Sequence, residues 1–227
     1  MLQLYIGNKN YSSWSLRPWL LMKHTGIGFE ERLLRLSWDD ASPFKKTLLS
    51  LAPSGRVPLL VDDGFAIWDS LAIAEYLAER FADKHLWPAD TKARARARSL
   101  CAEMHSGFAE LRNTFGMNIE AHLPEVGARM LRENAGAARD VKRIDTMWQE
   151  ALAASGGPFL FGDFSIADAY FAPVCTRIRT FALPVGAEAG AYAKRILALP
   201  AFLEWEKAAL AEHDYLVEDE PYRPRPA

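Results

Sequence analysis

The chain has 227 residues, half of them hydrophobic, and a formal net charge of −2 at pH 7. A chain of this size can bury a substantial core in one large domain or two smaller ones. The near-neutral charge argues against nucleic acid as a main partner, and the lack of any run of about 18 apolar residues argues against a membrane span. Because the N-terminus has no basic start followed by a long apolar run, we expect a cytoplasmic protein.

Up to about residue 80, short segments of alternating type predict a mixed α/β unit. The expected elements are a strand at Leu2 to Ile6, a helix at Ser13 to Thr25, a strand at Phe29 to Arg35, a short helix near Pro43 to Leu51, a hairpin with strands at Val57 to Val61 and Phe65 to Ile67, and a helix from Asp69 to about Arg80. This order is that of a thioredoxin-like domain, which we expect over residues 1–81.

After a connector around Ala82 to Asp90, helical periodicity dominates and predicts an all-helical second domain over residues 91–227. The expected helices are Thr91 to Phe115, Pro124 to Ala154, Ser165 to Phe181, Ala189 to Leu197 and Pro200 to Ala211. The biased composition of the tail Glu220 to Ala227 suggests a loosely ordered end.

The two cysteines, Cys101 and Cys175, lie far apart in apolar helical contexts, which predicts reduced, buried thiols. The five histidines are scattered, so we expect no metal cofactor.

The segment "NYSSWSLRPWL" places three serines where the first helical pattern begins. A serine at a helix start can accept a hydrogen bond from an unpaired backbone N–H, which explains one of the three. The other two need a further reason.

The segment "GRVP", Gly55 to Pro58, opens the third strand. A proline at this place is an edge feature or a cis peptide that turns the preceding backbone outward. The N–H and C=O of Val57 are then available to an extended peptide ligand.

The segment "WDSLAIAEYL" opens a helix with Asp69 and Ser70. Either residue alone is explained by helix capping. Together, a carboxylate for an ammonium group and a hydroxyl with first-turn amides for a carboxylate suit the two ends of an α-amino acid.

The segment "GDFSIADAYFAPV" matches a capping box, with Ser165 followed by Asp168 and then an apolar run. We expect Asp168 to be buried, fully hydrogen-bonded and structural.

The first-helix serines, "RVP", "DS" and "SIAD", at these separations, resemble the cytosolic glutathione S-transferases along nearly the whole chain. "SSWSLR" is similar to the serine-rich "SSCSWR" motif of the zeta class, with Trp14 in place of the cysteine, Leu16 in place of the tryptophan, and Arg17 kept. The resemblance is to a serine-type bacterial transferase.

The resemblance implies that Ser12 donates a hydrogen bond to the glutathione thiolate, with Ser13 supporting it. The alternative is that Ser12 only caps the helix. Tyr5 and Tyr11 are weaker rivals for the thiolate.

The remaining contacts follow from the chemical groups of glutathione, the co-substrate that the resemblance implies. We expect the backbone of Val57, ahead of Pro58, to pair with the cysteinyl unit, Asp69 with the γ-glutamyl ammonium, and Ser70 with its carboxylate. Arg56 is placed to meet the glycyl carboxylate, with Lys45 or Lys46 as a second cation there or as a solvent-facing charge.

The second substrate is expected against the helix Thr91 to Phe115, where a stripe of four side chains is either core or partly a pocket lining. These four are Met104, Phe108, Arg112 and Phe115. Arg177 and Arg179 are unusual in a core helix and lie about 200° apart, so at most one faces a given pocket. Zeta-class members act on acidic substrates, which makes these arginines candidates for a substrate carboxylate; structural ion pairs are the alternative.

The resemblance implies a glutathione transferase acting on a small electrophile, as in detoxification, and a homodimer. The alternatives are a zeta-like glutathione-dependent cis-trans isomerase of the maleylacetoacetate type, and a non-catalytic binding or regulatory protein of the same fold.

Overall fold

The N-terminal part of the chain forms a four-stranded sheet with strand order β2-β1-β3-β4. The structure, a computed structural model, describes residues 1–224. Strand β1 pairs in parallel with β2 and antiparallel with β3, and β4 completes the hairpin with β3. The elements of this part are β1 (Leu2–Ile6), α1 (Ser13–Thr25), β2 (Glu30–Leu33), α2 (Pro43–Leu51), β3 (Leu59–Asp62), β4 (Phe65–Trp68) and α3 (Ser70–Arg80).

The two faces of the sheet bury separate sets of side chains, because successive residues of a strand point to opposite faces. Leu4 and Ile6 of β1 join the main hydrophobic core, to which α1 and α3 also contribute. Leu59 and Val61 of β3 join a smaller cluster with Phe44 of α2. This two-sided cover is the thioredoxin-like arrangement that the order of elements predicts.

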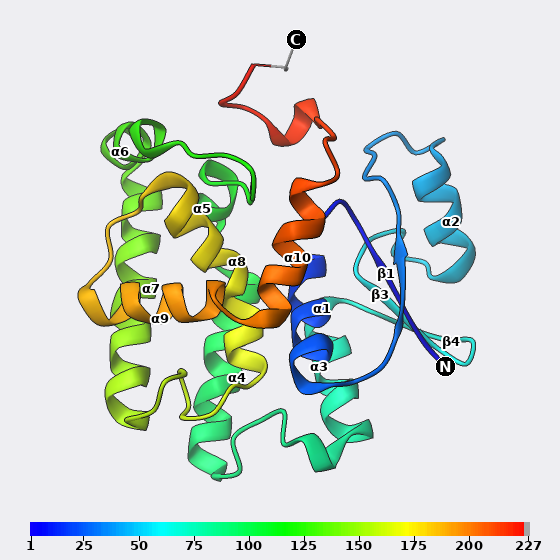
Figure 1. The fold of residues 1–227 in the computed structure, drawn as a ribbon, viewed down its shortest axis with the longest axis horizontal. Coiled ribbons are helices and arrows are strands. Elements are labelled where there is room, and N and C mark those ends of the chain that lie inside the picture. The colour runs from blue at the N-terminus through cyan, green and yellow to red at the C-terminus, as the bar shows by residue number, and fades with distance from the viewer. Residues whose placement is uncertain (225–227) are drawn as a thin grey trace.

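The rest of the chain is helical, as predicted. Helix α1 packs against α8 and α10 of this region as well as against α3, so it lies between the sheet and the helical part (Figure 1). The elements are η1 (Ala82–Lys84), α4 (Thr91–Ser106), α5 (Ala109–Thr114), α6 (Pro124–Glu133), α7 (Ala135–Ser155), α8 (Ile166–Phe181), α9 (Ala187–Leu197), α10 (Pro200–Leu210) and η2 (Val217–Asp219).

Two predicted helices are each divided in the structure. The helix predicted from Thr91 to Phe115 ends at Ser106, and a new helix begins after Phe108, whose φ of 53° lies in the left-handed region. The helix predicted from Pro124 to Ala154 is interrupted at Asn134, whose side chain accepts the N–H groups of the first turn of α7. Local backbone and capping chemistry therefore overrides the continuous periodicity at both points.

The C-terminal tail is more ordered than its composition predicts, at least as far as residue 224. The Glu220 carboxylate is buried and accepts hydrogen bonds from Tyr11 at 2.7 Å and Asn118 at 2.9 Å. Tyr222 donates to the carbonyl of Thr114. The prediction of a loose end is therefore wrong for this part of the tail, because its side chains pair with both domains; residues 225–227 lie outside the described chain.

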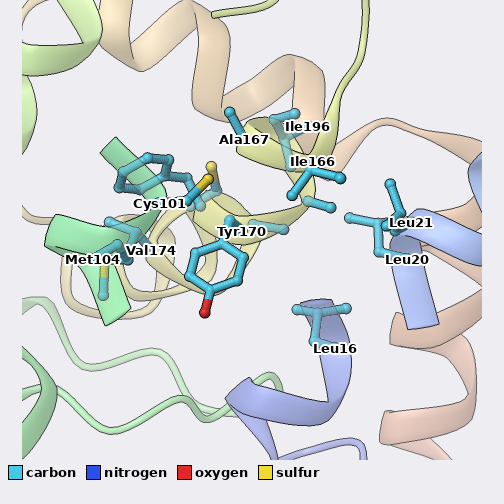
Figure 2. Close-up of a cluster of buried hydrophobic side chains, with 14 of the residues drawn as sticks. Leu16, Leu20, Leu21, Cys101, Met104, Ile166, Ala167, Tyr170, Val174 and Ile196 are labelled. Atoms are coloured by element: carbon cyan, nitrogen blue, oxygen red, sulfur yellow. The ribbon is translucent and has the colours of Figure 1, made fainter. Parts of the chain in front are cut away.

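Helices α1 and α8 pack against each other through apolar side chains of the main core. Figure 2 shows Leu16, Leu20 and Leu21 of α1 across from Ile166 and the ring of Tyr170 on α8. The hydroxyl of Tyr170 points away from Ile196 and Ala167, toward the space between α4 and the start of α1 (Figure 2). A polar group therefore emerges from an otherwise apolar contact.

The start of α8 is fixed by the predicted capping box. Asp168 is fully buried and accepts hydrogen bonds from the Leu160 N–H at 3.1 Å, the Ser165 N–H at 2.9 Å and hydroxyl at 3.1 Å, and the Tyr192 hydroxyl at 3.0 Å. Burial raises the pKa of this carboxyl to about 6, against the opposing effect of these donors. The prediction of a buried structural carboxylate is confirmed.

Both cysteines are free and buried, as expected. Burial raises the pKa of the Cys101 and Cys175 thiols, which keeps them in the unreactive protonated form. Within residues 1–224, no three His, Cys, Asp or Glu side chains gather to hold a metal ion. The same part of the chain has no helix long and apolar enough to cross a bilayer.

We expect Asp168→Ala to lower the thermal melting temperature, because it leaves two buried backbone N–H groups and the Tyr192 hydroxyl without an acceptor. The cost should be about 1–3 kcal/mol in the free energy of unfolding. Thermal melts followed by circular dichroism measure it, with the exposed Asp163→Ala as the control. Equal melting temperatures for the two variants would contradict the structural role of Asp168.

Candidate active site

Two adjoining cavities lie where the sheet domain meets the helical region. The larger has a volume of about 520 Å³ and the smaller about 410 Å³. Both are lined by Trp14, Arg56, Val57 and Arg112, so the cavities form one continuous cleft. An elongated ligand with several polar groups fits such a cleft better than a compact one.

The serines at the start of α1 lie at the wall of the larger cavity. Ser12 and Ser13 line it, and Ser12 occupies the N-cap position of α1. Within the described chain the Ser12 hydroxyl makes no capping hydrogen bond; it lies 2.7 Å from the Ser15 hydroxyl, which also accepts the N–H of Gly7 at 3.2 Å. The capping alternative for Ser12 is therefore not the arrangement that the structure shows.

The tyrosines near Ser12 have other contacts. Tyr11 also lines the larger cavity, but its one hydroxyl proton is directed at the Glu220 carboxylate at 2.7 Å, with the Asp214 carbonyl 3.1 Å away. Burial, together with Glu220, raises the pKa of Tyr11. Tyr5 packs against the smaller apolar cluster on the α2 side of the sheet. Neither hydroxyl is therefore placed as the Ser12 hydroxyl is.

The "RVP" segment forms the wall shared by the two cavities. The Val57–Pro58 peptide bond is cis, and Val57 lines both cavities while Pro58 lines the smaller. Arg56 is exposed between the two. Of the two predicted lysines, Lys45 lines the larger cavity and donates to the Gly55 carbonyl at 3.2 Å, whereas Lys46 faces solvent.

The start of α3 forms the floor of the smaller cavity. Asp69 and Ser70 both line it, and the exposed Asp69 carboxylate accepts the N–H of Leu71 at 2.8 Å. Ser70 is buried, with its hydroxyl 3.1 Å from that of Tyr170. Asp69 thus acts as a helix cap while its second carboxylate oxygen remains at the cavity.

Positive charge collects between the cavities and the core. The Arg177 guanidinium is buried at the larger cavity; its Nε donates to the Phe115 carbonyl at 2.7 Å, and its Nη1 has no hydrogen-bond partner among residues 1–224. Burial, together with the nearby Arg17 and Arg112, lowers the pKa of Arg177 to about 9. The group stays charged at neutral pH and forms no ion pair among residues 1–224.

Arg17 adds a second buried cation behind Trp14. Its guanidinium lies 4.0 Å from the ring centre of Trp14 and 4.1 Å from that of Tyr170, a stacked arrangement that aromatic faces favour. Burial lowers the pKa of Arg17 to about 10, which again leaves the group charged at pH 7.

Of the residues predicted to meet a second substrate, Arg112 and Arg177 line the larger cavity. Met104, Phe108 and Phe115 instead pack into the hydrophobic core; Met104 lies on α4, and Phe108 and Phe115 flank α5. Arg179 forms an ion pair with Glu206 of α10. The pocket prediction is therefore corrected for these four side chains.

Several side chains at the cleft escaped the sequence prediction. Trp14 stands at both cavities, His105 lines the smaller one, and Asp219 reaches the larger one from the C-terminal segment. Burial raises the pKa of Asp219 to about 6. Only the tail's return across the cleft brings Asp219 here, and no local pattern in the sequence signals that path.

The chain matches two family models: "Glutathione S-transferase, N-terminal domain" over residues 11–80 and "Glutathione S-transferase, C-terminal domain" over residues 93–208. Among curated proteins it is 30% identical over 179 residues to the maleylacetoacetate isomerase of Rattus norvegicus, with 78% of each chain covered. It is also 30% identical over 175 residues to glutathione S-transferase 1 of Dianthus caryophyllus, with 76% and 75% covered.

Solved structures with a similar fold include proteins named as glutathione transferases. A glutathione transferase homologue from Burkholderia, crystallised with bound glutathione, superposes with a TM-score of 0.68 at 27% identity, covering 93% of this chain and 98% of that one. A glutathione transferase from Methylococcus capsulatus also reaches a TM-score of 0.68, at 24% identity and with 93% and 100% covered.

Proposed function

This chain belongs to the glutathione S-transferase family. We propose that it is a glutathione transferase that binds glutathione along the cleft and stabilises the glutathione thiolate with Ser12. The family's co-substrate is a linear peptide with a carboxylate at each end and an ammonium group at one. The cleft offers polar groups of matching kind along its length.

The observation that carries the proposal is the placement of the Ser12 hydroxyl at the larger cavity, outside the capping network of α1. Glutathione attacks electrophiles as a thiolate, and a thiolate is stabilised by hydrogen-bond donors at a helix N-terminus. On binding, the thiol proton leaves to water and the Ser12 O–H donates to the sulfur.

The other two serines support this donor. Ser15 accepts the N–H of Gly7, and a hydroxyl proton can rotate to suit its partners. Ser15 then donates to the Ser12 oxygen, which frees the Ser12 proton for the sulfur. Such a chain of hydrogen bonds polarises its last donor. Ser13, also at the cavity wall, supports the site with its hydroxyl, because its N–H donates to the Tyr11 carbonyl.

Further residues along the cleft are proposed to bind the two ends of glutathione. The Asp69 carboxylate receives the γ-glutamyl ammonium, and Ser70 with the first amides of α3 receives the γ-glutamyl carboxylate. The backbone of Val57 pairs with the cysteinyl unit. Arg56, with Lys45 beside it, meets the glycyl carboxylate.

We expect the thiol of bound glutathione to titrate at about pH 7, below the ~8.5 of a free cysteine. Ser12→Ala should raise this pKa by about one to two, because a hydrogen bond to an anion contributes roughly 1.5–3 kcal/mol. Thiolate absorbance of the complex measures the titration. Ser37→Ala, which removes another hydroxyl from the same cavity, is the control; an unchanged titration in Ser12→Ala would exclude Ser12.

A second candidate function is a glutathione-dependent cis-trans isomerase of an unsaturated acid. The specific observation in its favour is the buried Arg177 guanidinium with an orphaned Nη1 at the larger cavity. A carboxylate of the substrate would supply the missing acceptor, with Arg112 as a second cation. The relative from Rattus norvegicus carries the name of such an isomerase.

If the second substrate is acidic, Arg177→Met should lower kcat/KM for maleylacetone by roughly 10- to 100-fold, the equivalent of about 1.5–3 kcal/mol. The rate with a neutral halonitrobenzene, measured on the same preparation, should change little. Arg179→Met is the matched control, because Arg179 pairs with Glu206. Equal losses for both substrates in Arg177→Met would mean that Arg177 only supports the fold.

We further propose that the protein is a homodimer. Leu49 and Phe65 are large apolar side chains of the N-terminal domain with 56% and 64% of their surface exposed. Burial of such side chains against a second copy, around a two-fold axis, would remove them from water.

Light scattering at micromolar concentration should give twice the mass of one chain. Phe65→Lys should shift the protein toward one chain, whereas Leu210→Lys, at another exposed apolar position on α10, should not. A wild-type mass equal to one chain would rule out the dimer.

A further inference from the structure

Four side chains from three elements form a continuous chain of polar contacts at the smaller cavity. His105 of α4 links Asp69 to Tyr170: its Nε2 is 3.3 Å from an Asp69 carboxylate oxygen, and its Nδ1 is 2.6 Å from the Tyr170 hydroxyl. The Tyr170 hydroxyl is 3.1 Å from that of Ser70. The two residues proposed to hold the γ-glutamyl group are thus joined to each other through the helical domain.

The protons of this chain have a single consistent direction when His105 is neutral. An ionised carboxylate only accepts hydrogen bonds, so the His105 proton lies on Nε2 and faces Asp69. Nδ1 then accepts the only proton of the Tyr170 hydroxyl. The Tyr170 oxygen in turn accepts from Ser70, so the Ser70 proton points at Tyr170 and not at the cavity.

A carboxylate that binds at Ser70 needs that proton. When Ser70 turns its O–H toward the ligand, its oxygen accepts from Tyr170 instead. The Tyr170 proton then no longer faces His105, and Nδ1 must supply a proton of its own to keep the 2.6 Å contact. Because Nε2 still faces the Asp69 carboxylate, both nitrogens of His105 carry a proton in this state.

We propose that His105 and Tyr170 are positioning residues for the γ-glutamyl group of glutathione, and that His105 takes up a proton when the ligand's carboxylate binds at Ser70. The proposal rests on the proposed glutathione site. No proton is created or lost: one is drawn from solvent onto Nδ1, and the Tyr170 and Ser70 protons each turn toward the next acceptor.

Charged groups of both signs surround His105. Asp69, at the start of α3, places a carboxylate oxygen 3.3 Å from Nε2. The positive groups are Arg17 of α1, stacked on Tyr170 and Trp14, and Arg112 of α5, whose guanidinium lies 5.5 Å from the Trp14 ring centre. The incoming carboxylate adds negative charge and the incoming ammonium group adds positive charge. The hydrogen-bond pattern at Ser70 therefore determines whether His105 carries a second proton.

Asp69 can serve His105 and the ligand together. One of its oxygens accepts the Leu71 N–H and the other faces Nε2 of His105. A carboxylate offers about four acceptor positions, so room remains for the ligand's ammonium group. His105 therefore fixes the orientation of the carboxylate without occupying it.

The test is isothermal titration calorimetry with S-methylglutathione, which has no thiol proton to release. Titrations at one pH near 7.5, in two buffers of different ionisation enthalpy, count the protons taken up. We expect uptake by the wild type to exceed that by His105→Gln and Tyr170→Phe. Affinity should fall about tenfold in both variants, the equivalent of roughly 1.4 kcal/mol, while kcat at saturating glutathione stays close to the wild-type value.

Two control variants separate positioning from folding. His122→Gln replaces an exposed histidine outside the chain, and Tyr192→Phe removes a buried tyrosine hydroxyl that binds Asp168. The first should behave as wild type, and the second should lower the melting temperature without changing proton uptake. His105 is partly exposed, so His105→Gln gives a reading even if Tyr170→Phe fails to fold.

If the wild type and His105→Gln bind S-methylglutathione with the same proton uptake, the proposal is wrong and the glutathione site stands. If the wild type does not bind S-methylglutathione, the proposed function fails and this proposal fails with it.

Discussion

The packing of α1 between the sheet and α8 is the constraint on which the rest of the site depends. Leu16, Leu20 and Leu21 of α1 lie across from Ile166 and Tyr170 of α8 in the main core (Figure 2), and the buried Ser15 of its first turn accepts the N–H of Gly7. The N-terminus of α1 therefore opens at the boundary of the two domains, where Ser12, Ser13 and Trp14 line the cleft. A shift of α8 would move both walls of the cleft at once, which ties the Asp168 capping box to the geometry of the site.

The cleft combines this fixed helix start with positive charge that the protein leaves uncompensated. Arg17 and Arg177 are buried, and each has at least one nitrogen without a hydrogen-bond partner in the described chain. Leaving a buried charge unpaired costs roughly 3–5 kcal/mol, so such groups persist in a fold where something offsets the cost. Aromatic stacking offsets part of it for Arg17, and an anionic ligand would do so for Arg177.

Sequence reasoning located the elements with strong local signals. The bounds of β1, α1 and α2, the buried Asp168 and the two free cysteines agree with the structure, because periodicity and capping chemistry act within a few residues of the chain. The helix breaks at Gly107 and Asn134 depend on single-residue backbone geometry, and a continuous apolar pattern hides them. His105, Tyr170 and Asp219 join the site through contacts between residues 35 or more positions apart, for which one sequence contains no signal. The same holds for Arg179, whose ion pair with Glu206 of α10 joins residues far apart in the sequence.

In the proposed mechanism the Ser12 hydroxyl turns its proton from Ser15 to the glutathione sulfur. A crystal structure of the complex with glutathione tests it most directly. We expect the sulfur within about 3.5 Å of the Ser12 oxygen, with the γ-glutamyl group at Asp69 and Ser70. A sulfur whose nearest hydrogen-bond donor is Tyr11 or another residue would contradict this role of Ser12.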